Sequence, residues 1–174
     1  SSARPASPVT PGTSSTSCGF LGGDPCTVLD DGTTENALGL TMGGWLCHMQ
    51  YIDCLGQVDE VLTAYGTLSM PGGITNGRPV KIAVWADGSA DEDPTTNLTL
   101  LQTLNTTVTN ASTDLLVSYP LPTSLLPVAG WIGAAVNHSA GEFPAPMDQT
   151  TMSPRSWIFG HTTPMQPIDL DNIR

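Results

Sequence analysis

Four acidic residues crowd one short stretch of the chain, where Asp87, Asp91, Glu92 and Asp93 lie within Asp87-Gly-Ser-Ala-Asp-Glu-Asp-Pro94. Hard cations such as Ca²⁺ prefer several oxygen ligands from one loop, and crowded carboxylates repel one another unless a cation joins them. The spacing does not match the D-x-[DN]-x-[DN]-G pattern of an EF-hand. Asp87, Asp91 and Asp93 are therefore candidate calcium ligands, with a solvated acidic loop as the alternative. The sequence requires no cofactor, and calcium is the one that it suggests.

The four cysteines are Cys18, Cys26, Cys47 and Cys54, and they favour two disulfides over a zinc site. Their spacing lacks the close C-x2–4-C pair that zinc prefers, and disulfides indicate an oxidising compartment. A local 18–26 bridge closes a turn-rich loop. A 47–54 bridge requires a turn, because seven extended residues span about 23 Å whereas bonded Cα atoms lie within ~7 Å. Bridges that cross between the two pairs are the alternative, and the connectivity stays open. We expect a secreted protein.

The histidines give no catalytic signature. His48, His138 and His161 form neither an H-x-H nor an H-E-x-x-H pattern, and no G-x-S-x-G nucleophile elbow is present. His138 stands at an expected strand end, between Asn137 and Ser139, where an imidazole commonly satisfies backbone groups. We expect no catalytic residues, and a secreted hydrolase is the enzymatic alternative.

Two sets of residues could interact with carbohydrate. The first set comprises the four tryptophans, which lie in strand-like patterns: Trp45, Trp85, Trp131 and Trp157. We expect tryptophans in such patterns to be buried in the core. Two of them exposed on one sheet face would instead form a platform on which a sugar ring stacks. The second comprises four N-x-[ST] sequons, which are candidate glycosylation sites where the host glycosylates: Asn97, Asn105, Asn110 and Asn137.

The strand that organises the chain is predicted over 79–87, where Val80, Ile82 and Val84 alternate with Lys81, Ala83 and Trp85. A second strand is predicted over 45–52, with a polar face that contains His48 and Gln50. The stretch 58–65 fits a strand or a helical turn, and its neighbours favour a strand. Further strands are expected over 97–109 as one long or two short segments, over 114–119 with a stop at Pro120-Leu-Pro122, and over 129–136, 156–159 and 167–171.

Composition favours many short strands joined by tight turns. The 174 residues include 18 Gly and 15 Pro, and only 12% are charged, a mixture that suits helices poorly. Residues 1–26 form a Pro/Ser/Thr-rich arm followed by a cysteine loop, and 27–174 form one domain of ordinary size. We predict an all-β fold, an antiparallel β-sandwich of jelly-roll type with nine or ten short strands.

Charge excludes some partners. The net charge of −11 and the isoelectric point near 4.2 argue against nucleic acid, whose backbone requires a basic surface. No apolar run approaches the ~20 residues of a membrane span. The chain starts with Ser1 rather than Met, which fits a mature N-terminus left by a removed signal peptide or tag.

Several stretches carry a family resemblance: LDDGTTENALGLTMGG (29–44), GRPVKIAVWADGSADEDP (77–94), GWIGAAVNHSAGEFPAPMDQTT (130–151) and PRSWIFG (154–160). Together they resemble an uncharacterised β-sandwich module of secreted bacterial proteins of planctomycete type, over most of residues 27–172. The resemblance implies an extracellular or cell-surface β domain and brings no catalytic residues. The cysteines and the arm are not part of the pattern.

These features together favour a non-enzymatic, secreted structural or interaction module of the cell surface. Its sharpest form is a self-assembling subunit of an extracellular filament or coat, in which the N-terminal arm adds to a neighbour's sheet edge. Expected partners are other copies of the chain or other cell-surface components. The alternative is a carbohydrate-binding module, stabilised by calcium, with a glycan as its ligand.

Overall fold

The computed structural model describes residues 36–53, 56–126, 129–147 and 156–161, and in these ranges it contains nine strands and no helix. The strands are β1 (Asn36–Leu38), β2 (Gly43–Ile52), β3 (Gly56–Thr63), β4 (Pro79–Asp87), β5 (Leu98–Thr107), β6 (Val117–Leu126), β7 (Ala129–Ser139), β8 (Ala145–Met147) and β9 (Ser156–His161). Every strand pair is antiparallel. The predicted all-β antiparallel sandwich is thereby confirmed, whereas its jelly-roll order stays a prediction. No helix in these ranges is long and apolar enough to cross a membrane.

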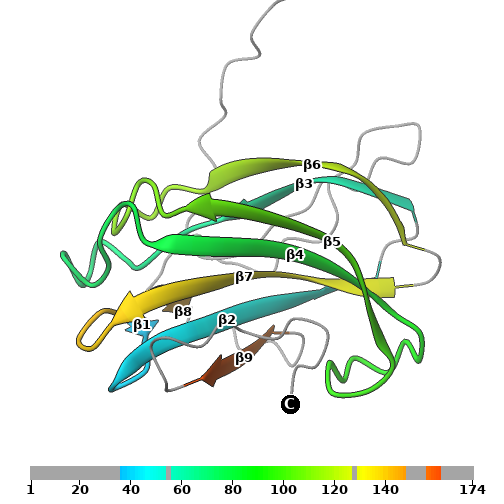
Figure 1. The fold of residues 1–174 in the computed structure, drawn as a ribbon, viewed down its shortest axis with the longest axis horizontal. Coiled ribbons are helices and arrows are strands. Elements are labelled where there is room, and N and C mark those ends of the chain that lie inside the picture. Colours follow the sequence, from blue (N-terminus) through cyan, green and yellow to red (C-terminus); the bar gives the residue numbers. More distant parts are fainter. Residues whose placement is uncertain (1–35, 54–55, 127–128, 148–155, 162–174) are drawn as a thin grey trace, which may run out of the picture.

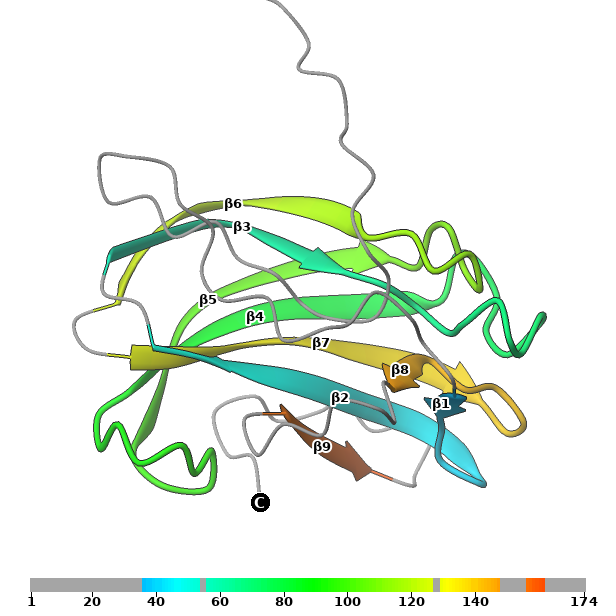
Figure 2. The same cartoon turned by 180° about the vertical axis from the view of Figure 1, so that it is seen from behind.

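The strands form one large and two small sheets. The large sheet has five strands in the order β5-β4-β7-β2-β9, β3 pairs with β6, and β1 pairs with β8. Figures 1 and 2 show β3 and β6 as a second layer beside the large sheet, and β1 and β8 beside the end where β2 begins and β7 ends. The predicted arm of residues 1–26 and the predicted last strand over 167–171 lie outside the described residues.

The inner face of the large sheet packs against β3 and β6. Val80, Ile82 and Val84 of β4 point to this face and join residues of β7, β3 and β6 in one core cluster. Each is at most 1% exposed, so each contributes about 1.5–3 kcal/mol of burial free energy. The predicted alternation of β4 is confirmed, and this cluster joins the two layers.

The outer face of the same sheet is also buried, and it is aromatic. Its core cluster contains Trp85 of β4 and Trp131 of β7, at 1% and 0% exposure. Gly133 packs closely against this cluster, because a Cβ there would lie 3.0 Å from the His48 carbonyl oxygen and 3.1 Å from Cζ3 of Trp85. All strand residues of this cluster belong to the large sheet.

The polar face predicted for β2 is not a solvent-facing surface. His48 and Gln50 point toward the inner face, where His48 contacts Thr63 of β3, and Gln50 is 5% exposed. The prediction was wrong because β2 pairs with both β7 and β9. A strand inside a sheet that is covered by a second layer buries its polar side chains together with its apolar ones.

Strand β6 runs through the prolines that were expected to stop it. It extends from Val117 to Leu126 and includes Pro120 and Pro122. Both prolines are exposed, and Pro120 lies at an irregularity where the register of β3 shifts between Val58 and Glu60. A strand with a single partner tolerates proline, because the missing N–H can lie on the unpaired side or at a bulge.

Strand β5 is one long strand rather than two short ones. Its register against β4 shifts where Val84 pairs with Gln102 and Trp85 pairs with Leu100, so Leu101 is an extra residue. The β-bulge sends the half-buried side chains before and after it to opposite faces of the sheet. Leu98 and Leu100 pack on the outer face, and Leu104 packs on the inner face.

Cys47 is a free, fully buried thiol on the outer face, so its predicted disulfide is wrong. The five residue steps from Cys47 to Ile52 in β2 span about 16 Å, and two further residues reach back at most ~7 Å. A Cys47–Cys54 bridge would need Cα atoms within ~7 Å, which the strand prevents. Cys18, Cys26 and Cys54 lie outside the described residues. Burial raises the pKa of Cys47 to about 12, so it carries almost no thiolate at neutral pH.

We predict that Cys47 resists alkylation by iodoacetamide in the folded protein and reacts fully in concentrated urea without prior reduction. Peptide mass spectrometry of labelled samples measures both states. Cys47 found in a disulfide-linked peptide of the unreduced, unfolded protein would contradict the free thiol, and a surface cysteine introduced at Thr103 provides the reactive control.

Candidate functional site

Asp87 ends β4 and organises the acidic loop that follows it. Its Oδ1 accepts hydrogen bonds from the backbone N–H groups of Ser89 and Ala90, at 3.0 and 2.9 Å, and from Ser89 Oγ at 2.9 Å. Its Oδ2 accepts one from the Trp131 indole at 3.4 Å. The carboxylate is 1% exposed. Asp87 is therefore a buried cap that joins the loop to the aromatic outer face.

Asp91 and Asp93 cap the loop locally. Oδ1 of Asp91 accepts the backbone N–H of Asp93 at 3.0 Å, which is the main cause that lowers the pKa of Asp91 despite some desolvation. Oδ1 of Asp93 accepts the N–H and hydroxyl of Thr95 at 2.9 and 2.6 Å. These bonds are the turn-capping pattern of Asp side chains.

The structure does not bring the three candidate calcium ligands together. Within the described ranges, no group of three or more His, Cys, Asp or Glu residues could hold a metal ion. Each predicted ligand instead uses its oxygens on N–H and O–H donors of the loop itself. The geometry supports the alternative reading of a self-capped acidic loop.

Three of the four tryptophans are core residues. Trp45, Trp85 and Trp131 are at most 7% exposed, so they do not provide the exposed platform that a sugar site of this kind needs. Trp157 of β9 is half-buried and stacks on Phe159, with ring centroids 5.9 Å apart and an interplanar angle of 12°. The structure thus removes the main support for the carbohydrate-binding alternative.

The sequons divide by position. Asn97, Asn105 and Asn110 are exposed and lie on β5 or in the turns at its two ends. Asn137 is partly buried within β7, where it pairs with Trp45 of β2. Glycosylation stays a prediction, and the fold restricts accessible acceptors to the three around β5.

His48 is buried between the two layers. Its Nε2 lies 3.0 Å from Thr63 Oγ1, and its Nδ1 is shielded from solvent without a hydrogen-bond partner. Burial lowers the pKa of His48 to about 4. Nearby on the same strand, Gln50 accepts a hydrogen bond from Ser156 Oγ at 2.7 Å, whereas its amide nitrogen is unpartnered. His48 is a neutral core histidine.

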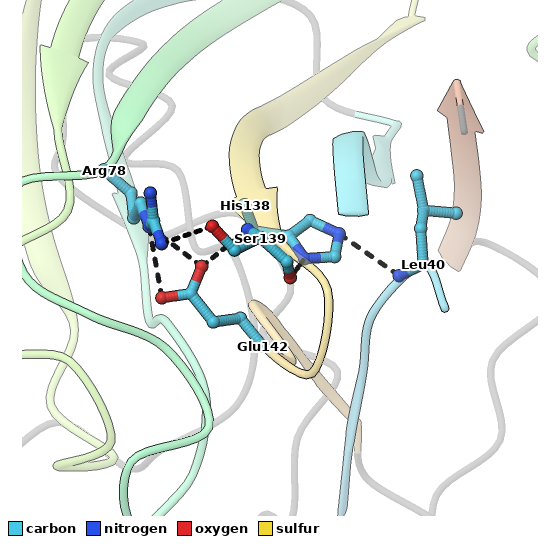
Figure 3. Close-up of polar contacts among 5 residues, drawn as sticks. All are labelled: Leu40, Arg78, His138, Ser139 and Glu142. Carbon is cyan, nitrogen blue, oxygen red and sulfur yellow. Dashed lines mark hydrogen bonds and ion pairs between the residues drawn. The ribbon is translucent and has the colours of Figure 1, made fainter. Parts of the chain in front are cut away.

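A second polar cluster joins the start of β4 to the end of β7 (Figure 3). Arg78 Nε lies 2.8 Å from Glu142 Oε2, and Arg78 also donates to Ser139 Oγ at 2.6 Å. Glu142 Oε2 accepts the backbone N–H of Ser139 at 2.7 Å. Desolvation opposes its ionisation, but the hydrogen bonds and Arg78 outweigh it and lower the pKa of Glu142.

His138 adjoins this cluster, and both its ring nitrogens bond to backbone groups, those of Leu40 and Ser139. The expectation for this strand end is thereby confirmed. The ring does not activate the Ser139 hydroxyl, so the cluster is no catalytic dyad. Sequence reasoning missed Arg78 and Glu142, since 64 residues separate them and no local pattern signals their pairing.

The remaining candidate for function is an edge of the large sheet. Strand β5 pairs with β4 and with no other described strand, and β9 is the opposite edge. The ten residues of β5, Leu-Thr-Leu-Leu-Gln-Thr-Leu-Asn-Thr-Thr, contain no charge and no proline. Natural edge strands are commonly short, charged or proline-containing, since an open edge is a template for further pairing.

Comparison of the chain with protein-family models, with curated proteins and with solved structures finds no match.

We predict that Asp87→Ala lowers the free energy of unfolding by about 1–3 kcal/mol, because it leaves the buried Trp131 indole and two loop N–H groups without their acceptor. Asp93→Ala, at a partly exposed position, should cost less than about 1 kcal/mol. Urea unfolding measures both, and calcium should raise the stability of neither variant nor of the wild type. A large calcium-dependent stabilisation lost in both variants would instead restore the metal site.

Acid should weaken the fold through His48. The folded-state pKa of about 4 lies below the ordinary 6.5, so the unfolded chain binds the proton more tightly and stability falls as pH drops from 6.5 toward 4. The full loss is about 3 kcal/mol. Urea unfolding at several pH values measures it, and His48→Gln should flatten this slope. An unchanged slope in the variant would assign the acid sensitivity to other groups.

Proposed function

We propose that the protein is a non-enzymatic, secreted structural module of the cell surface, whose copies associate into a filament or coat by strand addition at β5. The N-terminal arm, residues 1–17, is the segment that adds. This proposal agrees with the extracellular role implied by the resemblance of the sequence to a β-sandwich module of secreted bacterial proteins. The observation that carries it is the uncharged edge strand β5 of the large sheet, which among the described strands pairs with β4 alone.

Strand addition uses the backbone of an edge strand. One side of β5 hydrogen bonds to β4, and the N–H and C=O groups of its other side face no described strand. An added strand satisfies these groups, and its side chains interleave with those of β5. The bulge at Leu101 bends the edge, so an added strand pairs with the segment on one side of the bulge.

Charge favours the arm as the added segment. All 16 acidic residues of the chain lie after residue 17, whereas the arm contains one basic residue, Arg4, and no acidic one. Two acidic domains repel each other at most surfaces, so an uncharged strand and a weakly basic arm make the least costly contact. Pro5, Pro8 and Pro11 limit regular pairing and leave 12–17, Gly-Thr-Ser-Ser-Thr-Ser, as the stretch best suited to pair.

We predict that the full chain forms concentration-dependent oligomers and that deletion of residues 1–17 makes it monomeric. Lysines on the edge, in Leu101→Lys/Thr103→Lys, should weaken association by about tenfold or more, because the charges oppose edge pairing. The matched control is Thr123→Lys at an exposed position of β6, which should change nothing. Multi-angle light scattering and negative-stain microscopy measure the assembly.

The outcomes separate the parts of this proposal. A monomeric full chain at all concentrations would rule out self-association. Oligomers that survive arm deletion but not the β5 lysines would keep the edge and exclude the arm. Oligomers that survive both changes would place the interface elsewhere on the molecule.

A further inference from the structure

His138 lies at the end of β7, and its ring bridges two segments that are far apart in the sequence. Nε2 lies 3.1 Å from the backbone nitrogen of Leu40, in the connection from β1 to β2. Nδ1 lies 2.9 Å from the carbonyl oxygen of Ser139. The residue is 1% exposed, and Figure 3 shows the ring between these backbone groups.

The two contacts fix the protonation state of the ring. The Leu40 N–H can only donate, so Nε2 must carry a free lone pair. The Ser139 carbonyl can only accept, so Nδ1 must carry the hydrogen. Only the neutral Nδ1–H tautomer satisfies both. An imidazolium carries hydrogens on both nitrogens and would place the Nε2–H against the Leu40 N–H.

Close backbone packing prevents the turn from adjusting around a charged ring. Gly43 adopts φ of +74°, and a Cβ there would lie 2.7 Å from the His138 carbonyl oxygen. On the other side of Leu40, a Cβ at Gly39 would overlap the Glu142 carbonyl oxygen. The Gly43 N–H also bonds to the Leu40 carbonyl at 2.9 Å. The 39–43 turn is therefore held tightly against the 138–142 turn.

The charged groups near His138 are few. Among the described residues they are Glu142, after β7, which favours protonation, and Arg78, before β4, which opposes it. Strands β1 and β8 contain no ionisable side chain. The histidine of β2, His48, points between the two layers, where it contacts Thr63. Desolvation of the ring is the largest influence and lowers the pKa of His138.

We propose that His138 is an acid-sensitive latch: its protonation breaks the contact with Leu40, frees the 39–43 turn and releases β1 from β8. The β1–β8 ladder has three residue pairs, one of them Ala37 with Pro146, which has no N–H to donate. Ala37 is buried, and among the described strands β8 is the one that pairs with β1. This latch goes beyond the proposed self-association, although β1 is the first described strand after the arm.

The direction of the pH dependence follows from linkage. The closed latch requires neutral His138, so the open state binds a proton more tightly than the closed state. The latch contributes fully above the ordinary histidine pKa of 6.5 and weakens as pH falls below that value. Acidification to about pH 5 should raise the open population by up to about 30-fold.

Two NMR measurements on the full chain test the latch. Long-range ¹⁵N–¹H correlations at about pH 7.5 should show His138 as the neutral Nδ1–H tautomer; an Nε2–H tautomer or an imidazolium would overturn the proposal. Amide exchange, corrected for its intrinsic pH dependence, should show Leu40 and the β1 amides losing up to about 30-fold of their protection at about pH 5. The central amides of β4 and β7 should keep theirs.

Two variants test whether His138 causes the pH-dependent loss of amide protection at Leu40 and β1. His138→Gln removes the titrating group and should abolish the local pH response, whereas the matched control His48→Gln should retain it. Persistence of the response in His138→Gln would overturn the proposal and point to Glu142, as would loss of the response in Glu142→Gln alone. If His138→Gln does not fold, the wild-type tautomer and exchange data still decide the question. Light scattering on the same samples distinguishes latch opening from any change in self-association.

Discussion

The structure depends on burial of both faces of one five-stranded sheet. Strands β4 and β7 lie at its centre and place aliphatic side chains on the inner face and tryptophans on the outer face. The close approach of Trp85 to Gly133 shows that the outer face is tightly packed at this point. Because burial of apolar surface is the dominant favourable contribution to folding, this sheet positions everything else.

The polar side chains at the two ends of the sheet join separate chain segments through hydrogen bonds and an ion pair. At one end Asp87 caps the acidic loop and accepts the Trp131 indole. At the other end, where β4 begins and β7 ends, Arg78, Glu142 and His138 join three chain segments. In the described part of the chain, residues whose types suggested chemistry thus satisfy backbone groups and turns, and strands β5 and β9 are the edges of the large sheet.

The long central strands could be predicted from the sequence, since period-two alternation at Val80, Ile82 and Val84 follows directly from strand geometry. Whether the candidate calcium site forms could not be predicted from periodicity or spacing. Its three aspartates are close in the sequence, but in the folded loop each carboxylate accepts hydrogen bonds from donors of the loop itself. The same holds for β6, where Pro120 and Pro122 are tolerated because β3 is the one described strand that pairs with it.

The sequence by itself determined the fold class, the many short strands and the acidic character, because these follow from local propensity, periodicity and composition. It also indicated that His138 would serve backbone groups at a strand end. Only the tertiary structure decided which strands are edges, that Cys47 is buried and free, and that Arg78 pairs with Glu142. These features depend on contacts between segments distant along the chain, and a local pattern has no information about which segment will lie beside it.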